Sequence, residues 1–446
     1  RARLGGRAVS SARRARNVVA AAAVAAYAIV AAPGTSLAEP DTLAIVGAEV
    51  RVGDGTVVEN GTVIVRDGRI VSVTKGGDAP TGATVIDGKG KVLTPGFVAV
   101  GNEVGLIEIE LEPTTDDAAP QDDDGIHPAF GAVDGYNPDS SLIPITRLAG
   151  VTSVVPAPGV GLVSGTSAWF DLRPGTPAEV TVKPLAAVHA NLSTGAVDRF
   201  GGGARPEAFA RLRQLLDDAR LYRTAKAAYD KRAMRETRAT QADLERLGEV
   251  LAGKLPLVVW VSRSADILRV LDVAKAYRVR LVLAGVEEGW KVASAIAAAE
   301  VPVLVRPLTN LPEQFDRLQS RYDNAALLQK AGVTVIPVAM GPHDARQLRE
   351  QVGNAIAWGL DPAHALRGIT LEPARLFGLD SDYGTVAKGK VANLALWTGD
   401  PFDLRTWATN VIIQGRAMPM RSRQTALFER YKVLRPGEEG RGMPRW

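Results

Sequence analysis

Cysteine is absent from this chain of 446 residues, histidine occurs only four times, and aromatic residues make up only 5% of it. Without cysteine, neither a disulfide framework nor a catalytic thiol is possible. The chain also lacks an apolar run of the roughly 18 residues that a membrane-spanning helix needs, which excludes a polytopic membrane protein. With 46% hydrophobic and 23% charged residues, the composition is that of a globular protein. The length predicts two to four domains, or one large barrel with an attachment.

The formal net charge of +4 comes from the N-terminal segment. Residues 1–38 hold six arginines and no acidic residue, so 47 basic and 49 acidic residues remain in the rest. That remainder has no excess positive charge of the kind that nucleic-acid binding requires, and no nucleic-acid partner is expected. In residues 1–38 the arginines precede the apolar run Val18–Ala32, and Ser36-Leu37-Ala38 provides small residues for cleavage. This pattern predicts a signal peptide and export, to a bacterial periplasm, with an uncleaved anchor as the alternative.

Both ends of the body have β character. Short alternating apolar runs in residues 39–94 are separated by Asp54-Gly55, Asn60-Gly61, Asp67-Gly68 and Asp87-Gly88, which are strong hairpin signals. The same alternation of apolar and polar residues returns in residues 377–420, where the predicted strands are Gly384–Lys388, Asn393–Trp397 and Asn410–Ile413. We expect the two ends to form one composite β-sandwich, followed by a polar tail over residues 421–446.

Residues 95–376 have a different pattern of apolar residues. Buried apolar runs such as Val151–Val155, Pro256–Val261 and Val333–Val338 alternate with helical patterns such as Pro206–Asp230 and Thr240–Ala252. Strands alternating with helices indicate a parallel sheet, and this many units favour a (β/α) barrel, with a doubly wound sheet as the alternative.

Five segments carry a resemblance to a known family. Val85–Phe97 resembles the lead-in to the first barrel strand of the amidohydrolase superfamily, and Gly384–Leu394 resembles that superfamily's return into its β-sandwich. Ile369–Ala374 is similar to the helix before that return. Tyr136–Ser140 and Gly150–Val154 look closest to exported, imidazolonepropionase-related members. The resemblance implies a TIM (β/α)8 barrel of amidohydrolase type that hydrolyses non-peptide C–N bonds in small amides or cyclic imides.

Such a family site would hold one or two divalent metals, typically zinc, at the carboxyl ends of the strands. Histidines and an aspartate would then be the ligands. In this chain the corresponding positions carry Gly101, Glu103, Trp260, Gly285 and Met340. The ligand set is therefore missing, and no metal cofactor is expected.

Other polar residues fall near predicted strand ends. The candidates for a pocket are Glu103, Ser262, Arg263, Glu288, His343 and Asp344. Each has a structural alternative: Ser264 predicts a helix cap next to Ser262 and Arg263, and Asp344 can cap another helix. Glu108, Glu110 and Glu112 alternate with apolar residues, which predicts the solvated face of a strand rather than a calcium loop.

Two functions follow. The first is a catalytically silent amidohydrolase-superfamily protein that binds a small ligand or supports a catalytically intact paralogue, or a second copy of itself, as a subunit. The alternative is an active, divergent amidohydrolase that uses the polar candidates above.

Overall fold

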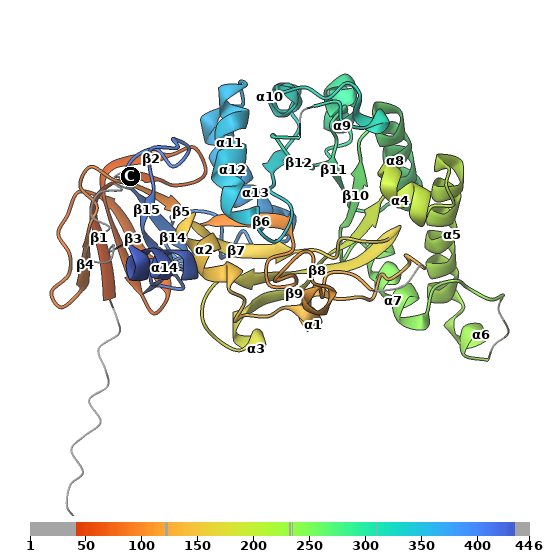
Figure 1. Ribbon diagram of the computed structural model, residues 1–446, viewed down its shortest axis with the longest axis horizontal. Helices are drawn as coiled ribbons and strands as arrows, with labels where there is room; N and C mark the ends of the chain where they lie inside the picture. The colour runs from red at the N-terminus through yellow and green to blue at the C-terminus, as the bar shows by residue number, and fades with distance from the viewer. Residues whose placement is uncertain (1–41, 121–123, 232, 234, 310, 433–446) are drawn as a thin grey trace, which may run out of the picture. The chain divides into compact units, whose positions relative to one another are not determined.

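The main element is a curled sheet of eight strands in the order β13-β12-β11-β10-β9-β8-β7-β6 (Figure 1). The computed structural model describes residues 42–120, 124–231, 233, 235–309 and 311–432, so the predicted signal peptide and most of the predicted tail lie outside the described residues. The strands are β6 (Phe97–Asn102), β7 (Val151–Pro156), β8 (Val163–Asp171), β9 (Thr181–Asn191), β10 (Leu257–Val261), β11 (Leu281–Gly285), β12 (Val303–Val305) and β13 (Val335–Pro337).

One strand of this sheet runs against the others. β9 to β13 pair in parallel, as do β6 and β7, but β8 is antiparallel to both β7 and β9. A parallel pairing needs a crossover of a dozen or more residues. The connections before and after β8 are shorter than that, so β8 has to turn back on each neighbour. The predicted α/β class is confirmed, but the regular (β/α) alternation is interrupted at β8.

The sheet is not closed by strand pairing among the described residues, because β6 and β13 stand at its two ends. Residues 368 and 369 lie between them. The Val98 amide donates to the carbonyl of Ile369 at 2.8 Å. On the other side, a Cβ at Gly368 would stand 2.7 Å from the carbonyl oxygen of Val335, so only glycine allows this approach. The predicted barrel is thus a half-barrel whose opening is bridged by the end of a helix.

Helices flank the sheet, and Figure 1 shows α8, α9, α10, α11 and α12 along one side of it. The α-helices are α1 (Ala132–Gly135), α2 (Leu142–Leu148), α3 (Pro177–Val180), α4 (Thr194–Arg199), α5 (Arg205–Thr224), α6 (Lys226–Asp230), α7 (Gln241–Leu251), α8 (Ser264–Tyr277), α9 (Ala293–Ala298), α10 (Asn324–Lys330), α11 (Leu348–Ala357), α12 (Pro362–Gly368), α13 (Leu371–Leu376) and α14 (Arg423–Tyr431). Short 3-10 helices are η1 (Pro113–Thr115), η2 (Gly289–Val292), η3 (Phe315–Arg317) and η4 (Ala345–Gln347).

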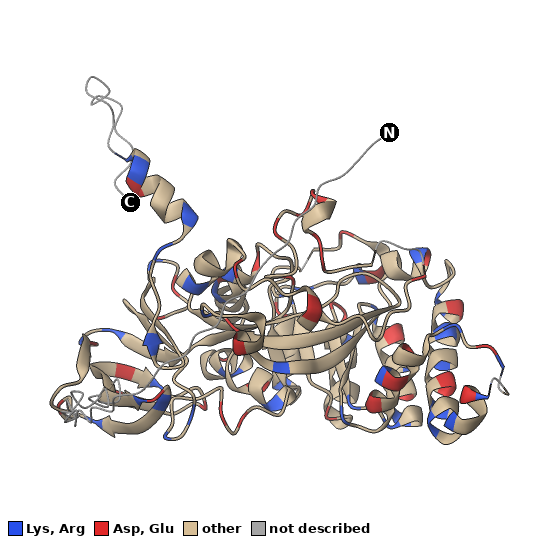
Figure 2. Ribbon diagram, turned by 90° about the horizontal axis from the view of Figure 1, so that it is seen from below, with Lys and Arg blue, Asp and Glu red and all other residues tan. Residues whose placement is uncertain are grey.

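Local sequence explains several helix boundaries. α7 begins where Thr240 and Asp243 form a reciprocal capping box. α8 ends at Tyr277, and its C-cap residue Arg278 takes the left-handed conformation with φ of 56°. The predicted helix Pro206–Asp230 is divided at Ala225 into α5 and α6. The helices carry both signs of charge (Figure 2). Among the described residues, no helix is both long and apolar enough to cross a membrane.

A second sheet joins the two ends of the described chain. Its order is β16-β15-β14-β5-β1-β2-β3, with β4 paired to β1. Its strands are β1 (Thr42–Arg51), β2 (Val57–Arg66), β3 (Arg69–Lys75), β4 (Thr84–Asp87), β5 (Val92–Pro95), β14 (Leu394–Trp397), β15 (Ala408–Ile413) and β16 (Arg416–Ala417). The pairing of β5 with β14 confirms that the two ends build one β unit. Its eight strands belong to one hydrogen-bonded sheet, and apolar side chains from both ends of the chain share one core.

The hairpin signals have different outcomes. Asp67 and Gly68 both have positive φ, 51° and 77°, as the two-residue turn between β2 and β3 requires. The predicted strand Gly384–Lys388 is wrong, because this segment is a series of bends and turns. Within this segment, the Val386 amide donates a hydrogen bond to the carbonyl of Val52, the residue after β1, at 2.8 Å.

A buried carboxylate ties the two sheets together. Asp171, at the end of β8, accepts hydrogen bonds from Ser153 of β7 at 2.7 Å and from the Asn393 amide, next to β14, at 2.9 Å. Its other oxygen accepts from Tyr383 and Gln414. Burial raises the pKa of Asp171, although all four hydrogen bonds act to lower it.

Candidate functional site

A cavity of about 310 Å³ opens at the carboxyl ends of the half-barrel strands, where α/β barrels place their sites. Its wall is formed by residues at or just after the ends of seven strands, together with the segment that carries η3. The lining residues are Gly101, Glu103, Ala157, Pro158, Gly159, Ser164, Asn191, Ser193, Trp260, Val261, Ser262, Glu287, Arg306, Gln314, Arg317 and Met340.

Trp260, at the end of β10, occupies the centre of the strand ends. A Cβ at Gly101 would lie 3.9 Å from Cζ2 of its indole, and a Cβ at Gly285 would lie 3.4 Å from Cε3. The ring therefore spans from β6 to β11. Both glycines have left-handed backbone, with φ of 71° and 81°, a conformation that costs other residues about 1–2 kcal/mol.

The residues present do not fit the metal that the family resemblance implies. Gly101, Trp260, Gly285 and Met340 offer no oxygen or imidazole ligand, and Glu103 alone remains of the five positions. Within the described ranges, no group of three or more His, Cys, Asp or Glu side chains could hold a metal ion. A zinc site needs three or four such ligands. That the protein carries no metal stays a prediction.

Glu103 is the acidic residue of the cavity nearest to β6. It follows Asn102, whose side chain bonds the neighbouring backbone at Ala99 and Val104 and so holds the strand end in place. Burial raises the pKa of Glu103 to about 7, and the charges of Asp116 and Glu110 add to this effect. At neutral pH, the carboxyl group therefore exists in both protonated and ionised forms.

Two guanidinium groups face the same cavity. Arg306, just after β12, lies over the Trp260 ring with Cζ 5.9 Å from its centroid, and its Nη2 donates to Glu287 at 3.4 Å. Arg317, in η3, is almost fully buried, and its Nη2 donates to the exposed Glu313 at 2.7 Å. Neither Nη1 makes a hydrogen bond to another described residue. The cavity thus holds two cations with donors left over.

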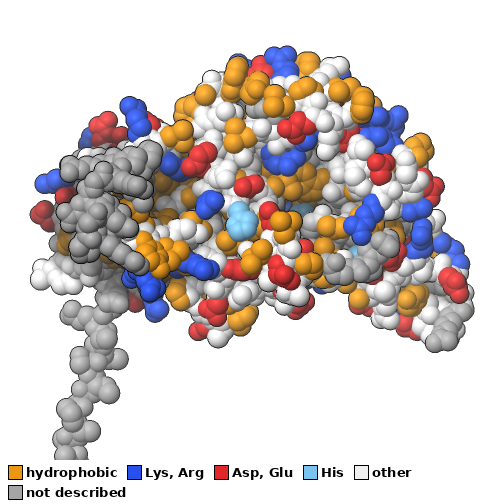
Figure 3. Space-filling model, in the orientation of Figure 1, with side chains coloured by type: hydrophobic (Ala, Val, Ile, Leu, Met, Phe, Trp, Pro, Cys, Tyr) orange, Lys and Arg blue, Asp and Glu red, His pale blue; other side chains and the backbone are white. Residues whose placement is uncertain are grey.

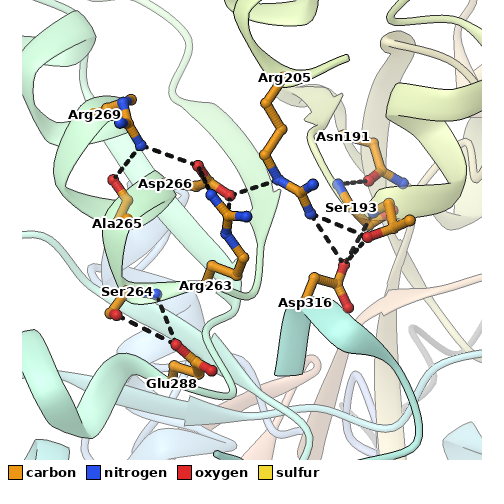
Figure 4. Close-up of polar contacts among 11 residues, drawn as sticks. Asn191, Ser193, Arg205, Arg263, Ser264, Ala265, Asp266, Arg269, Glu288 and Asp316 are labelled. Carbon is orange, nitrogen blue, oxygen red and sulfur yellow. Dashed lines mark hydrogen bonds and ion pairs between the residues drawn. The ribbon is translucent and has the colours of Figure 1, made fainter. Parts of the chain in front are cut away.

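The segment bearing Arg317 is held by its neighbour Asp316, which is buried (Figure 4). Asp316 accepts hydrogen bonds from the Thr194 amide at 3.0 Å and the Thr194 hydroxyl at 2.7 Å. Arg205 reaches the same hydroxyl with Nη2 at 3.1 Å and pairs through Nε with Asp266 at 2.8 Å. Figure 4 shows Arg205 between the two carboxylates. α4, α5, α8 and η3 are joined through this network.

Of the predicted pocket residues, Glu103 and Ser262 line the cavity, and Arg263 and Glu288 lie beside it without lining it. Arg263 pairs with Asp266 at 2.9 Å. Glu288 accepts from the amide and hydroxyl of Ser264, at 3.3 and 3.2 Å. Ser264 was predicted to cap this helix, but it is the first residue of α8 instead; the N-cap residue is Arg263, and no side chain caps the helix.

His343 and Asp344 lie elsewhere, beside the acidic loop. A Cβ at Gly341 would stand 3.6 Å from both Asp344 and Glu110. Burial acts to raise the pKa of Glu108, but hydrogen bonds from Ser140 and Ser141, helped by the charge of His343, lower it overall. The predicted strand through Glu108 and Glu112 is wrong, since this stretch is a loop with η1. The structure thus does not join His343 and Asp344 to the cavity wall.

The other histidines are accounted for individually. His189 on β9 is buried, its Nε2 lies 2.8 Å from the Ser167 hydroxyl, and burial lowers its pKa to about 4. His364 sits in the first turn of α12, which Asp361 caps, as a helix start predicts. His127 is in a loop. Figure 3 shows that acidic, basic and hydrophobic side chains are interspersed on the face drawn there.

Sequence reasoning missed Arg306, Arg317 and Asn191. Arg306 follows the run Val301–Val305 and Asn191 ends β9, so the rule that barrel sites collect at strand ends could have found both. Arg317 left no such signal, because it reaches the cavity from a connecting segment 11 residues beyond Arg306.

Comparison with known proteins agrees with this architecture. The sequence model of the Amidohydrolase family matches residues 225–418. A solved amidohydrolase from Thermotoga maritima MSB8 is 25% identical and superposes with a TM-score of 0.77, covering 85% of this chain and all of that one. The molinate hydrolase structure, 16% identical with a TM-score of 0.54 over 85% of this chain and 95% of that one, shares the fold.

Two curated relatives are similar in sequence. The chain is 23% identical over 406 residues to an imidazolonepropionase from Sphingopyxis alaskensis, covering 78% of this chain and 89% of that protein. It is also 23% identical over 421 residues to the amidohydrolase tasK of Hapsidospora irregularis, and spans only 41% of the length of that relative. The chain therefore carries an Amidohydrolase family domain over residues 225–418 and has the fold of a solved amidohydrolase.

Proposed function

We propose that this protein binds a small polar ligand in the strand-end cavity and does not carry out the metal-dependent hydrolysis of its superfamily. The observation that supports this most directly is the position of Trp260. Its ring fills the space between Gly101 and Gly285, where ligand side chains would have to meet. At the same time, a cavity with two arginines remains beside it. The superfamily architecture is kept while its metal chemistry is lost.

The test is the metal content of the purified protein. After loading with excess zinc and removal of unbound metal, we expect less than about 0.1 zinc per chain, because no three ligands converge. A superfamily member with an intact His-x-His motif, treated alongside, should retain one or two. Retention of one zinc by this protein, lost in Glu103→Gln, would contradict the proposal.

A second candidate function is metal-free hydrolysis of an amide or cyclic imide. The observation that favours it is Glu103, whose pKa of about 7 suits a general base acting on water near neutral pH. Zinc-free protein would then hydrolyse such substrates with a rate that falls at least about a hundredfold in Glu103→Gln. Equal rates for the two proteins, at the level of the uncatalysed reaction, would exclude this candidate.

We also propose export to the periplasm and a role beside a catalytically intact paralogue. The support for export is the arginine-rich and apolar pattern of residues 1–38. Cell fractionation with a C-terminal tag tests the compartment. Purification of the tagged protein from its native cells tests the partner, and recovery of the protein alone at every salt concentration would argue against it.

A further inference from the structure

We propose that the cavity binds a small molecule through its carboxylate group, which Arg306 and Arg317 hold with help from Asn191 and Ser193. This inference rests on the proposed ligand-binding function and specifies the chemistry of the ligand. It follows from which hydrogen-bonding groups of the wall are engaged and which are not.

Donors outnumber free acceptors on this part of the wall. The carbonyl oxygen of the Asn191 side chain already accepts the Ser193 amide at 2.9 Å, so its NH2 group is left to donate. Arg306 and Arg317 each use Nη2 on a glutamate and retain Nη1. An ionised ligand group that only accepts hydrogen bonds matches this set, and a carboxylate does so with planar geometry suited to guanidinium.

The glutamates that pair with the arginines do not cancel this preference. Glu313 is 61% exposed in its side chain, and a pair of that kind is weakened by solvent. Glu287 is the one buried glutamate paired with them: it lines the cavity, contacts Arg306 at 3.4 Å and has no partner for its Oε2 among the described residues, so a single carboxylate stands against two guanidinium groups. Glu103 also lines the cavity, and with a pKa of about 7 it is partly protonated at neutral pH and in that form can donate a hydrogen bond. A carboxylate in the cavity therefore meets a net attraction.

Asp316 is a positioning residue for this site. Asp316 accepts two hydrogen bonds from Thr194, which is the first residue of α4 and follows Ser193. These bonds hold η3 against the start of α4. Arg317 and Ser193 thereby come to the same part of the wall although they are far apart in sequence. Loss of these two hydrogen bonds should weaken ligand binding, although Asp316 itself does not contact the ligand.

The first experiment measures binding of N-acetylglycine and succinate, and of their uncharged amides, to the zinc-free full-length protein at pH 7 by calorimetry. We expect each carboxylate to bind at least about tenfold more tightly than its amide, the value of one hydrogen bond to a charged group. Arg306→Gln and Arg317→Gln should each remove at least about tenfold of that affinity. Arg321→Gln, four residues from Arg317 and outside the cavity wall, is the matched control and should bind as the native protein does.

Asp316→Asn tests the positioning role, and its circular dichroism and denaturation midpoint show that it folds. We expect it to weaken carboxylate binding while leaving amide binding unchanged. Equal affinity for carboxylate and amide, or binding unaffected by both Arg306→Gln and Arg317→Gln, would overturn the inference. The zinc measurement tests the proposed function separately. A protein that binds no zinc but prefers the amides would therefore contradict only the inference that the ligand carries a carboxylate.

Discussion

The indole of Trp260 lies against Gly285, with Cε3 3.4 Å from the place where a Cβ on that glycine would stand. The Oε2 of Glu287 would stand closer still, at 3.1 Å. A side chain at position 285 would therefore meet the indole on one side and a buried carboxylate on the other, and the two neighbours together restrict what this strand end can carry.

Gly285→Ala should destabilise the protein more than Gly253→Ala. Both glycines have left-handed backbone, but a Cβ at Gly253 meets nothing within 4 Å, whereas one at Gly285 meets Trp260 and Glu287. Gly253→Ala should therefore cost only the backbone strain of about 1–2 kcal/mol, and Gly285→Ala more. Urea denaturation gives both free energies of unfolding. In a Trp260→Ala background the extra cost at Gly285 should shrink, and the same cost at both glycines would show that the indole does not crowd the site.

Glu103→Gln should stabilise the protein at high pH. The pKa of Glu103 is about 7 in the folded chain, against an ordinary value of 4.5 for a glutamate. The folded state holds the proton more tightly, so this group lowers the stability as the pH rises from about 4.5 to 7, and the loss is complete above that. The free energy of unfolding of Glu103→Gln should equal that of the native protein near pH 4 and exceed it by on the order of 3 kcal/mol at pH 8. Denaturation at the two pH values measures it, and parallel stability curves would contradict the shifted pKa.

Asp171→Ala should be strongly destabilising. It leaves Ser153, Asn393, Tyr383 and Gln414 without their shared acceptor between the two sheets. Unpaired buried polar groups of this kind cost about 3 kcal/mol or more together. Guanidinium denaturation would show it as a lower midpoint. Asp230→Ala, which removes the exposed partner of Lys226, is the control and should hardly move the midpoint.

Parts of the fold could be predicted because their cause is local. The Asp67-Gly68 turn depends on two residues that tolerate positive φ, and α7 begins where Thr240 and Asp243 can cap each other. The direction of β8 was not predicted, since it depends on the length of connections between strands whose limits were themselves uncertain. The alternation of Glu108, Glu110 and Glu112 was misread as a strand, because the loop's hydrogen bonds go to Ser140 and Ser141 instead of a neighbouring strand.

The sequence by itself determined which side chains are available: no cysteine, four histidines, and none of these at positions 101, 103, 260, 285 and 340, which the resemblance aligns with the superfamily's ligands. No tertiary arrangement can supply an imidazole that the chain lacks. Only the tertiary structure decided that Arg306, Arg317 and Asn191 share one cavity and that Glu103 has a pKa near 7. Packing brings residues that are distant in sequence close together and removes water from a buried carboxyl group. Neither effect can be predicted from the residues that are neighbours in sequence.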